Sequence, residues 1–127
     1  VTGGGSGIGR AIAESYAKEG AKVIIAGRRE EVLREVSEAN ETISYVVADI
    51  TNSADVTKIA EAIQSDFNGH LDILVNNAGW APVTPLKELT IADYDRAFAL
   101  DVRALLDVTI QTLPFILQSK ANIINLS

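Results

Sequence analysis

Short runs rich in Val and Ile alternate with longer stretches of helical periodicity along the whole chain. Continuous β-branched runs are typical of strands covered on both faces, and apolar residues three and four positions apart are typical of amphipathic helices. The pattern predicts five strands, of which the first is represented only by its last residues. They lie at residues 1–2, 22–26, 44–48, 71–75 and 122–126.

Helical segments are expected between these strands. Gly20 and Gly69 are expected to end the first and the third helix, because glycine is common just past a helix end. Thr90 and Asp93 have the spacing of a capping box that opens a fourth helical region running toward Gln118. The apolar positions that mark the first three helices are Ile8, Ala11, Ile12 and Tyr16, then Val32, Leu33, Val36 and Ala39, then Val56, Ile59, Ala60, Ile63 and Phe67.

The order of these elements is βαβαβαβαβ, with a proline- and glycine-containing loop at residues 76–89. Strands that alternate with helices of this length pair in parallel through right-handed crossovers, so the predicted fold class is α/β with a doubly wound parallel sheet. No linker or repeat interrupts it, and residues 1–127 are expected to form one domain. Because the chain lacks Met and begins just before a glycine cluster, we expect a fragment truncated at both ends that lacks most of its first strand.

Composition narrows the range of partners. The chain has no cysteine, which excludes disulfides and cysteine zinc sites, and we assign no metal ligands. A net charge of −6 argues against nucleic acid, whose phosphates need clustered Lys and Arg. The longest uncharged stretch, residues 73–86, is broken by two asparagines and two prolines, so no membrane span is expected. We expect a cytoplasmic protein that binds small molecules.

Residues 2–9 read Thr-Gly-Gly-Gly-Ser-Gly-Ile-Gly, between a strand end and a helix start. Glycines there permit positive φ and close backbone approach to a pyrophosphate, while the helix N-terminus offers N–H donors. The alternative is a flexible Gly/Ser turn. The spacing of Gly3, Gly7 and Gly9 is not Gly-x-Gly-x-x-Gly, and the Gly-Lys-Ser/Thr ending of a nucleoside triphosphate loop is absent.

Three motifs together resemble the short-chain dehydrogenase/reductase family: Thr-Gly-x3-Gly-Ile-Gly at residues 2–9, Asp49 after the third strand, and Asn-Asn-Ala-Gly at residues 76–79. The resemblance covers essentially the whole chain. It implies a Rossmann-like fold and an oxidoreductase that transfers a hydride between a nicotinamide cofactor and a carbonyl or alcohol. It further implies that the glycine turn holds the pyrophosphate, that Asp49 binds the adenine, and that residues 76–79 wall the adenosine side.

The cofactor-binding residues that the resemblance designates are Gly3, Gly5, Ser6, Gly7, Ile8, Gly9, Asp49, Ile50, Asn77, Ala78 and Gly79. Taken alone, Asp49 is equally compatible with a helix-capping or turn residue.

The end of the second strand indicates which nicotinamide cofactor is bound. NAD-binding folds place an Asp or Glu there for the ribose 2′-hydroxyl, and NADP-binding folds place an Arg nearby for the 2′-phosphate. Gly27 takes the place of the acid, and Arg28 offers a planar fork suited to phosphate. We therefore expect NADP(H) in preference to NAD(H). The alternative is that Arg28 and Arg29 form a solvated pair facing Glu30 and Glu31.

The family's catalytic Tyr-x3-Lys pair is absent from these 127 residues, because none of Tyr16, Tyr45 and Tyr94 has Lys at the fourth position after it. Ser127 stands one residue before the expected place of the family serine, and we interpret it as a polar strand-end residue. The chain as given is therefore expected to be inactive.

Asp101 is the one catalytic candidate, because it occupies the place of the asparagine that organises the family's lysine. A carboxylate accepts hydrogen bonds but donates none, and near a lysine it would raise that lysine's pKa. Either Asp101 marks an altered mechanism or it is a helix-surface acid.

The lone histidine, His70, is interpreted as a surface loop residue, and Trp80 either lines the ligand cleft or packs locally.

Residues 97–117 contain three charged side chains and are apolar nearly all round. A helix that packs only one face against a sheet does not need apolar residues all round it. In the resembled family, this helix commonly helps to form dimers and tetramers. We therefore expect a homo-oligomer.

Two other functions compete with the oxidoreductase. A non-catalytic dinucleotide-binding or regulatory protein on the same scaffold would account for Asp101 and for the missing Tyr-x3-Lys pair. A methyltransferase that uses S-adenosylmethionine ranks last, because Gly27 and Arg28 replace the acid expected after its second strand.

Overall fold

The computed structural model describes all 127 residues and contains two pairs of parallel strands. Strand β1 (Val23–Gly27) pairs with β2 (Ile43–Val47), and β3 (Ile73–Asn76) pairs with β4 (Asn122–Asn125). Each strand lies within two residues of its predicted position. Leu71, predicted to begin a strand, instead packs in the core while its N–H donates to the Ser119 hydroxyl at 3.0 Å.

Val1 and Thr2 join the two pairs of strands. Thr2 forms a parallel bridge with Ala26 of β1 and donates its N–H to the Val75 carbonyl of β3 at 3.0 Å. Across the sheet the order is therefore β2, β1, residues 1–2, β3 and β4, which is the 3-2-1-4-5 order of a doubly wound sheet. The predicted α/β fold with parallel strands is confirmed.

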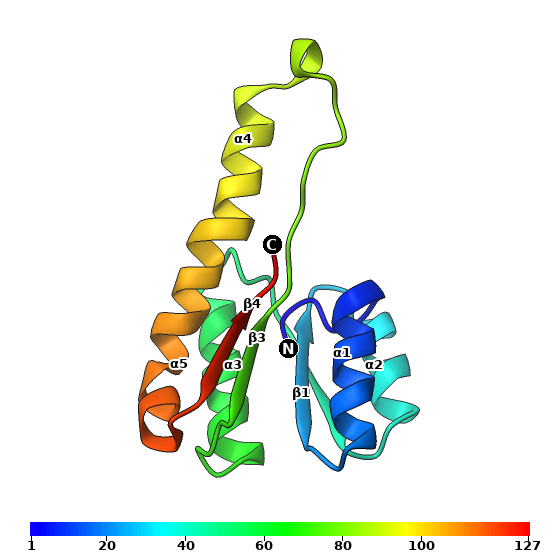
Figure 1. The fold of residues 1–127 in the computed structure, drawn as a ribbon, viewed down its shortest axis with the longest axis vertical. Helices are drawn as coiled ribbons and strands as arrows, with labels where there is room; N and C mark the ends of the chain where they lie inside the picture. The colour runs from blue at the N-terminus through cyan, green and yellow to red at the C-terminus, as the bar shows by residue number, and fades with distance from the viewer.

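Helices cover both faces of the sheet (Figure 1). Helices α1 (Gly7–Lys18) and α2 (Glu30–Glu38) lie on one face, and α3 (Ser53–Asp66) and α5 (Leu105–Ser119) lie on the other. Successive side chains of a strand point to opposite faces, so Ile25 packs toward α1 and α2 whereas Ile24 packs toward α3 and α5.

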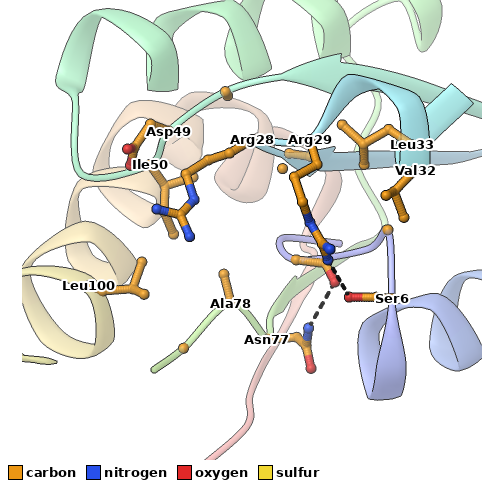
Figure 2. A pocket seen from close by; sticks show the side chains of 16 residues that line it. Ser6, Arg28, Arg29, Val32, Leu33, Asp49, Ile50, Asn77, Ala78 and Leu100 are labelled. Atoms are coloured by element: carbon orange, nitrogen blue, oxygen red, sulfur yellow. Dashed lines mark hydrogen bonds between the residues drawn. The ribbon is translucent and has the colours of Figure 1, made fainter. Parts of the chain in front are cut away.

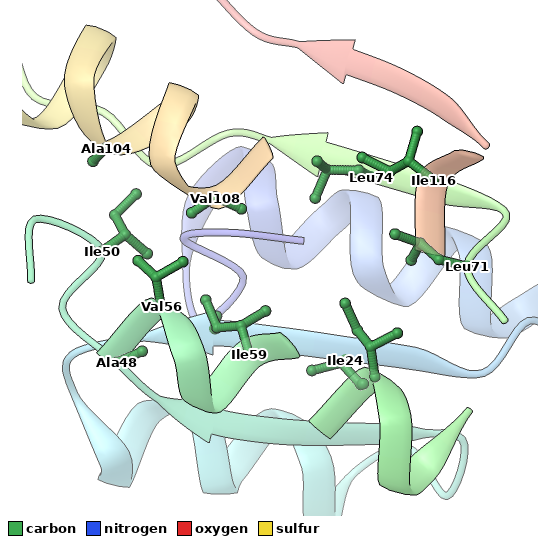
Figure 3. Close-up of a cluster of buried hydrophobic side chains, with 12 residues drawn as sticks. Ile24, Ala48, Ile50, Val56, Ile59, Leu71, Leu74, Ala104, Val108 and Ile116 are labelled. Carbon is green, nitrogen blue, oxygen red and sulfur yellow. The ribbon is translucent and has the colours of Figure 1, made fainter. Parts of the chain in front are cut away.

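Two apolar cores result, one on each face. The smaller core contains Ala13, Val23, Ile25, Leu33, Val36 and Ile43. The larger core, shown in Figure 3, contains Ile24, Ala26, Ala48, Ile50, Val56, Ile59, Ile63, Leu71, Leu74, Ala104, Val108 and Ile116. These cores hold the carboxyl ends of β1, β2 and β3 at one edge of the sheet.

After β3 the chain runs through a long loop and a short 3₁₀ turn, Leu86–Glu88, to helix α4 (Ile91–Phe98), which projects away from the sheet (Figure 1). The predicted capping box is present: Asp93 N–H donates to Thr90 Oγ1 at 3.1 Å, and Thr90 N–H donates to Asp93 Oδ2 at 3.0 Å. None of the helices combines the length and apolar character that a bilayer crossing requires.

The helical region predicted from Thr90 to Gln118 is not one regular α-helix. A π-helical segment, η2 (Ala99–Ala104), joins α4 to α5. The sequence gives no periodicity signal for such a segment, because it spans little more than one turn. Its residues lie beside the loop that follows β3, where they contribute to the site described next.

Candidate cofactor-binding site

A pocket of about 310 Å³ opens at the carboxyl ends of the strands (Figure 2). It lies where the strand order reverses, between residues 1–2 and β3, which is where open α/β sheets bind their ligands. The pocket is lined by Gly3, Gly5, Ser6, Ala26, Gly27, Arg28, Arg29, Val32, Leu33, Ala48, Asp49, Ile50, Asn77, Ala78, Gly79 and Leu100.

The glycine turn is tightly packed beneath this pocket. A Cβ atom on Gly9 would lie 2.3 Å from the Gly3 carbonyl oxygen and 2.4 Å from the Asn77 amide nitrogen, both too close for any side chain. A Cβ on Gly4 would meet the Ile25 side chain at 2.6 Å. Gly7 has nothing within 4 Å, but its φ of +54° requires glycine for conformational reasons.

The first turn of α1 is left available to an anion. Ser6 is the N-cap residue, yet its side chain forms no cap hydrogen bond, and the first turn contains no acidic residue. Instead the Ser6 hydroxyl accepts a hydrogen bond from Arg29 Nη2 at 3.1 Å. The positive end of the helix dipole and its backbone N–H groups therefore have no carboxylate partner of their own.

Residues 76–79 are pinned to the glycine turn through Thr2. The buried Thr2 hydroxyl accepts hydrogen bonds from the N–H groups of Asn77 and Ala78, at 3.0 and 3.1 Å. Asn76 faces the other way, and its amide donates to Asn125 Oδ1 at 2.9 Å. This first asparagine therefore ties β3 to β4 outside the pocket, whereas Asn77 belongs to the pocket wall.

Asp49 lies at the end of β2 in a local turn. Its Oδ1 accepts hydrogen bonds from the Thr51 N–H at 3.0 Å and the Thr51 hydroxyl at 2.7 Å, and its own N–H donates to Asp55. The Lys58 side chain and this Asp49 N–H hold the pKa of Asp55 below its ordinary value. The turn interpretation and the ligand interpretation of Asp49 are thus compatible, since the turn fixes the carboxyl group at the pocket wall.

Arg28 and Arg29 line the pocket on two sides. Figure 2 shows Arg28 beside Asp49 and Ile50, and Arg29 directed toward Ser6. Neither arginine forms an ion pair, and both residues are exposed, as the alternative of a solvated pair also predicts. Both positive charges are available to a ligand.

The structure brings most of the predicted cofactor residues together. Around the pocket lie Gly3, Gly5, Ser6, Arg28, Asp49, Ile50, Asn77, Ala78 and Gly79. Gly7, Ile8 and Gly9 are outside its lining and form the first turn of α1 next to it. Sequence reasoning missed the apolar wall of Val32, Leu33, Ala48 and Leu100. The start of the predicted second helix was a usable signal for Val32 and Leu33, whereas Leu100 gave none.

The remaining candidates lie outside the pocket lining. Asp101, in η2, accepts a hydrogen bond from the Trp80 N–H at 2.8 Å. His70 lies 3.0 Å from Asp72, and both side chains are well exposed, at 65% and 77%. Ser127 follows β4 and is exposed.

Comparison with known proteins agrees with this geometry. The family model described as short chain dehydrogenase matches residues 1–127. An uncharacterised oxidoreductase of Staphylococcus epidermidis is 36% identical over 129 residues, which cover 100% of this chain and 56% of that protein. An uncharacterised oxidoreductase of Staphylococcus aureus is 35% identical over 130 residues, with the same coverage.

Solved structures give the same result. A short-chain dehydrogenase from Streptomyces avermitilis superposes with a TM-score of 0.89 at 32% identity, covering 100% of this chain and 47% of that one. The 3-ketoacyl-(acyl-carrier-protein) reductase from Brucella melitensis, complexed with NADH, superposes with a TM-score of 0.90 at 34% identity, covering 98% and 53%. The chain spans about half the length of these relatives. It belongs to the short chain dehydrogenase family of oxidoreductases, which bind nicotinamide dinucleotides.

Proposed function

We propose that the protein transfers a hydride between NADP(H) and a small carbonyl or alcohol substrate, and that residues 1–127 supply its cofactor-binding part. The observation that carries this proposal is the pocket at the strand ends, which combines a glycine turn, an uncapped helix N-terminus and two unpaired arginines. The nicotinamide supplies the hydride chemistry, and the protein supplies binding, orientation and electrostatics.

The residues present fit such a cofactor. The close packing of Gly9 against Gly3 and Asn77 brings the backbone of the turn to the pocket without side chains in the way. We assign the pyrophosphate to this turn, with Gly3, Gly5 and Ser6 in the pocket wall and the N–H groups of Gly7, Ile8 and Gly9 as donors. We assign the adenosine end to the remaining wall, which contains Asp49, Ile50, Asn77, Ala78 and Gly79.

The preference for NADP(H) rests on the end of β1. Gly27 carries no side chain there, so no carboxylate repels a 2′-phosphate. Arg28 follows directly and presents a guanidinium to the pocket without a competing ion pair. An arginine fork pairs with phosphate oxygens in a bidentate manner, which a ribose hydroxyl cannot match.

Direct titration of the full-length natural protein with NADPH and NADH tests this function. We expect NADPH to bind at least about tenfold more tightly, because charge-assisted hydrogen bonds to the 2′-phosphate are the strong ones. Equal affinities, or tighter binding of NADH, would overturn the NADP(H) preference. If neither NADPH nor NADH binds, the oxidoreductase proposal is overturned as well. A panel of carbonyl compounds, assayed by oxidation of the reduced cofactor, then identifies the substrate class.

We further propose that the protein is a cytoplasmic homo-oligomer. Helices α4 and α5 and the η2 segment between them leave a row of large apolar side chains exposed, and a second copy of the chain would cover it. The row, called here the apolar stripe, consists of Ile91, Tyr94, Phe98, Val102, Leu106, Ile110, Leu113 and Leu117. Neither a non-catalytic dinucleotide-binding protein nor a methyltransferase is favoured, because the related curated proteins are oxidoreductases.

A further inference from the structure

Trp80 is held from two directions by the helical segment that lies beside it. Its backbone N–H donates to Oδ1 of Asp101 at 2.8 Å, and the guanidinium carbon of Arg96 lies 4.0 Å from the centre of its ring. Arg96 belongs to α4 and Asp101 to η2, so both contacts come from one continuous helical stretch. A cation over an indole face is attracted by the ring, and a carboxylate acceptor gives a charge-assisted hydrogen bond.

The contact with Asp101 reaches the wall of the cofactor pocket. Trp80 directly follows Gly79, which lines the pocket. A Cβ atom on Gly79 would lie 3.2 Å from the same Oδ1 atom that accepts the Trp80 N–H. The missing side chain at Gly79 therefore lets the carboxylate approach the loop, and Asp101 holds the loop through the N–H of the peptide bond that joins Gly79 to Trp80.

The helical stretch also contributes to the pocket directly. Leu100, the neighbour of Asp101, is part of the pocket lining. Both residues belong to the π-helical segment, and such segments occur mostly as single turns and are frequent at functional sites. One turn thus places an apolar side chain in the pocket and a carboxylate on the loop that contributes Gly79 to the pocket lining.

We propose that Asp101 is a positioning residue that holds the Gly79–Trp80 backbone in place as a wall of the cofactor pocket, with Arg96 securing the Trp80 ring. This proposal rests on the NADP(H) function given above, and it assigns to Asp101 a role through the loop instead of contact with the reacting atoms. The Trp80 N–H requires an acceptor and not a charge. Asp101→Asn retains an acceptor oxygen, whereas Asp101→Leu removes it at similar size.

The test uses the full-length protein and two separate readouts. The first is the affinity for NADPH, measured by calorimetry. The second is the emission spectrum of Trp80, obtained as the difference between each variant and the same variant with Trp80→Phe. Trp80 is the only tryptophan of the 127 residues. Asp95→Leu is the matched control, because Asp95 is an exposed aspartate of α4 that forms no ion pair.

We expect Asp101→Leu to shift the Trp80 emission and to weaken NADPH binding about tenfold, since one hydrogen bond to a charged acceptor is lost. Asp101→Asn should restore both readouts to within about threefold of the parent protein, and Asp95→Leu should change neither. Gly79→Ala is a second variant: its Cβ would lie 3.2 Å from Asp101 Oδ1, so the carboxylate must shift slightly and the Trp80 emission should change in the same direction as in Asp101→Leu, by a smaller amount.

An unchanged spectrum and an unchanged affinity in Asp101→Leu would overturn the proposal while NADPH binding by the parent protein still supported the function. A failure of Asp101→Asn to restore either readout would also overturn it, because the role would then depend on charge. If the parent protein binds no NADPH, the proposed function fails, and the emission shifts of Asp101→Leu and Gly79→Ala decide the Asp101 contact by themselves. If Asp101→Leu does not fold, the emission of Gly79→Ala decides the proposal, because Gly79 itself lines the pocket and its affinity readout is not specific to Asp101.

Discussion

Thr2 and Asn77, 75 positions apart in the chain, are joined by two hydrogen bonds of 3.0 Å: the Asn77 N–H donates to the Thr2 hydroxyl, and the Asn77 side-chain amide donates to the Thr2 carbonyl. The same amide nitrogen lies where a Cβ on Gly9 would have to fit. The glycine turn and the loop after β3 are therefore one packed unit, and each depends on the other for its shape.

Gly9→Ala tests this packing. The added methyl group has no room, because the Gly3 carbonyl oxygen and the Asn77 amide would both be within 2.4 Å of it. Overpacking of this kind costs about 1–3 kcal/mol, so we expect the free energy of unfolding to fall by about that amount and NADPH binding to be lost. Denaturant titration measures the first effect and calorimetry the second.

Gly5→Ala is the control for stability, because its Cβ would meet only the movable Leu33 and Val32 side chains, at 3.3 and 3.4 Å. It should unfold at nearly the parent denaturant concentration. A Gly9→Ala protein as stable as Gly5→Ala would contradict the packing argument.

Arg28→Ala tests the choice of cofactor. We expect the dissociation constant for NADPH to rise at least about tenfold, because a charge-assisted bond to the 2′-phosphate is lost, and that for NADH to change little. Arg34→Ala is the control, since Arg34 lies on α2 near Glu38 and does not line the pocket. Equal weakening of both cofactors by Arg28→Ala would show that this arginine does not read the phosphate.

Asp107 gives a prediction on pH. Hydrogen bonds from the Ser53 hydroxyl, and then from the Gln111 amide, hold the pKa of Asp107 below its ordinary value. A carboxyl group whose pKa is lowered by folding stabilises the protein above its unfolded pKa, and that contribution disappears as the pH falls through the folded pKa. Acidification from about pH 5 to about pH 3 should therefore destabilise the parent protein more than Asp107→Asn.

Thermal unfolding at several pH values measures this difference. At neutral pH we expect Asp107→Asn to melt about 3 °C below the parent protein, and we expect the gap to close on acidification. Asp95→Asn is the control for a simple change in net charge. If the difference in melting temperature stays constant from neutral to acid pH, the hydrogen bonds of Asp107 do not lower its pKa in the folded protein relative to the unfolded chain.

The apolar stripe gives a prediction on assembly. Leu106 and Ile110 lie one turn apart on α5 and are 55% and 56% exposed. We expect Leu106→Glu combined with Ile110→Glu to convert the oligomer to a monomer, because charges at the centre of an apolar interface remain unpaired. Light scattering gives the mass. Val83→Glu, at a fully exposed apolar residue outside the stripe, is the control, and a parent protein that is already a monomer would contradict the prediction.

Much of the fold could be predicted because its signals are local. The periodicity around Ile24 or Ile59 reports a strand or a helix within a few residues, and glycines and caps mark the ends. The place of residues 1–2 between β1 and β3 had no such signal, because it depends on hydrogen bonds from Thr2 to a strand more than seventy positions away.

In the candidate site, too, residues marked by a local motif could be predicted and residues placed by long-range contacts could not. Motif residues such as Gly3, Asp49 and Asn77 were recognisable from their spacing, and the structure places them around one pocket. Leu100 and the contact of Asp101 with Trp80 were not recognisable, because they depend on the path of the loop after β3 and on a π-helical turn. Neither feature alters the apolar pattern of the sequence.

That π-helical turn, Ala99–Ala104, also determines which face of the following helix, α5, points toward the sheet. A π-helical turn holds about one residue more than an α-helical turn, which rotates the following helix by about 100°. It is this rotation that directs Val108 and Ile116 into the larger core and leaves Leu106 and Ile110 on the surface. Deletion of a single residue within this turn would rotate α5 by about 100° relative to the sheet, so that Val108 and Ile116 would no longer point into the larger core.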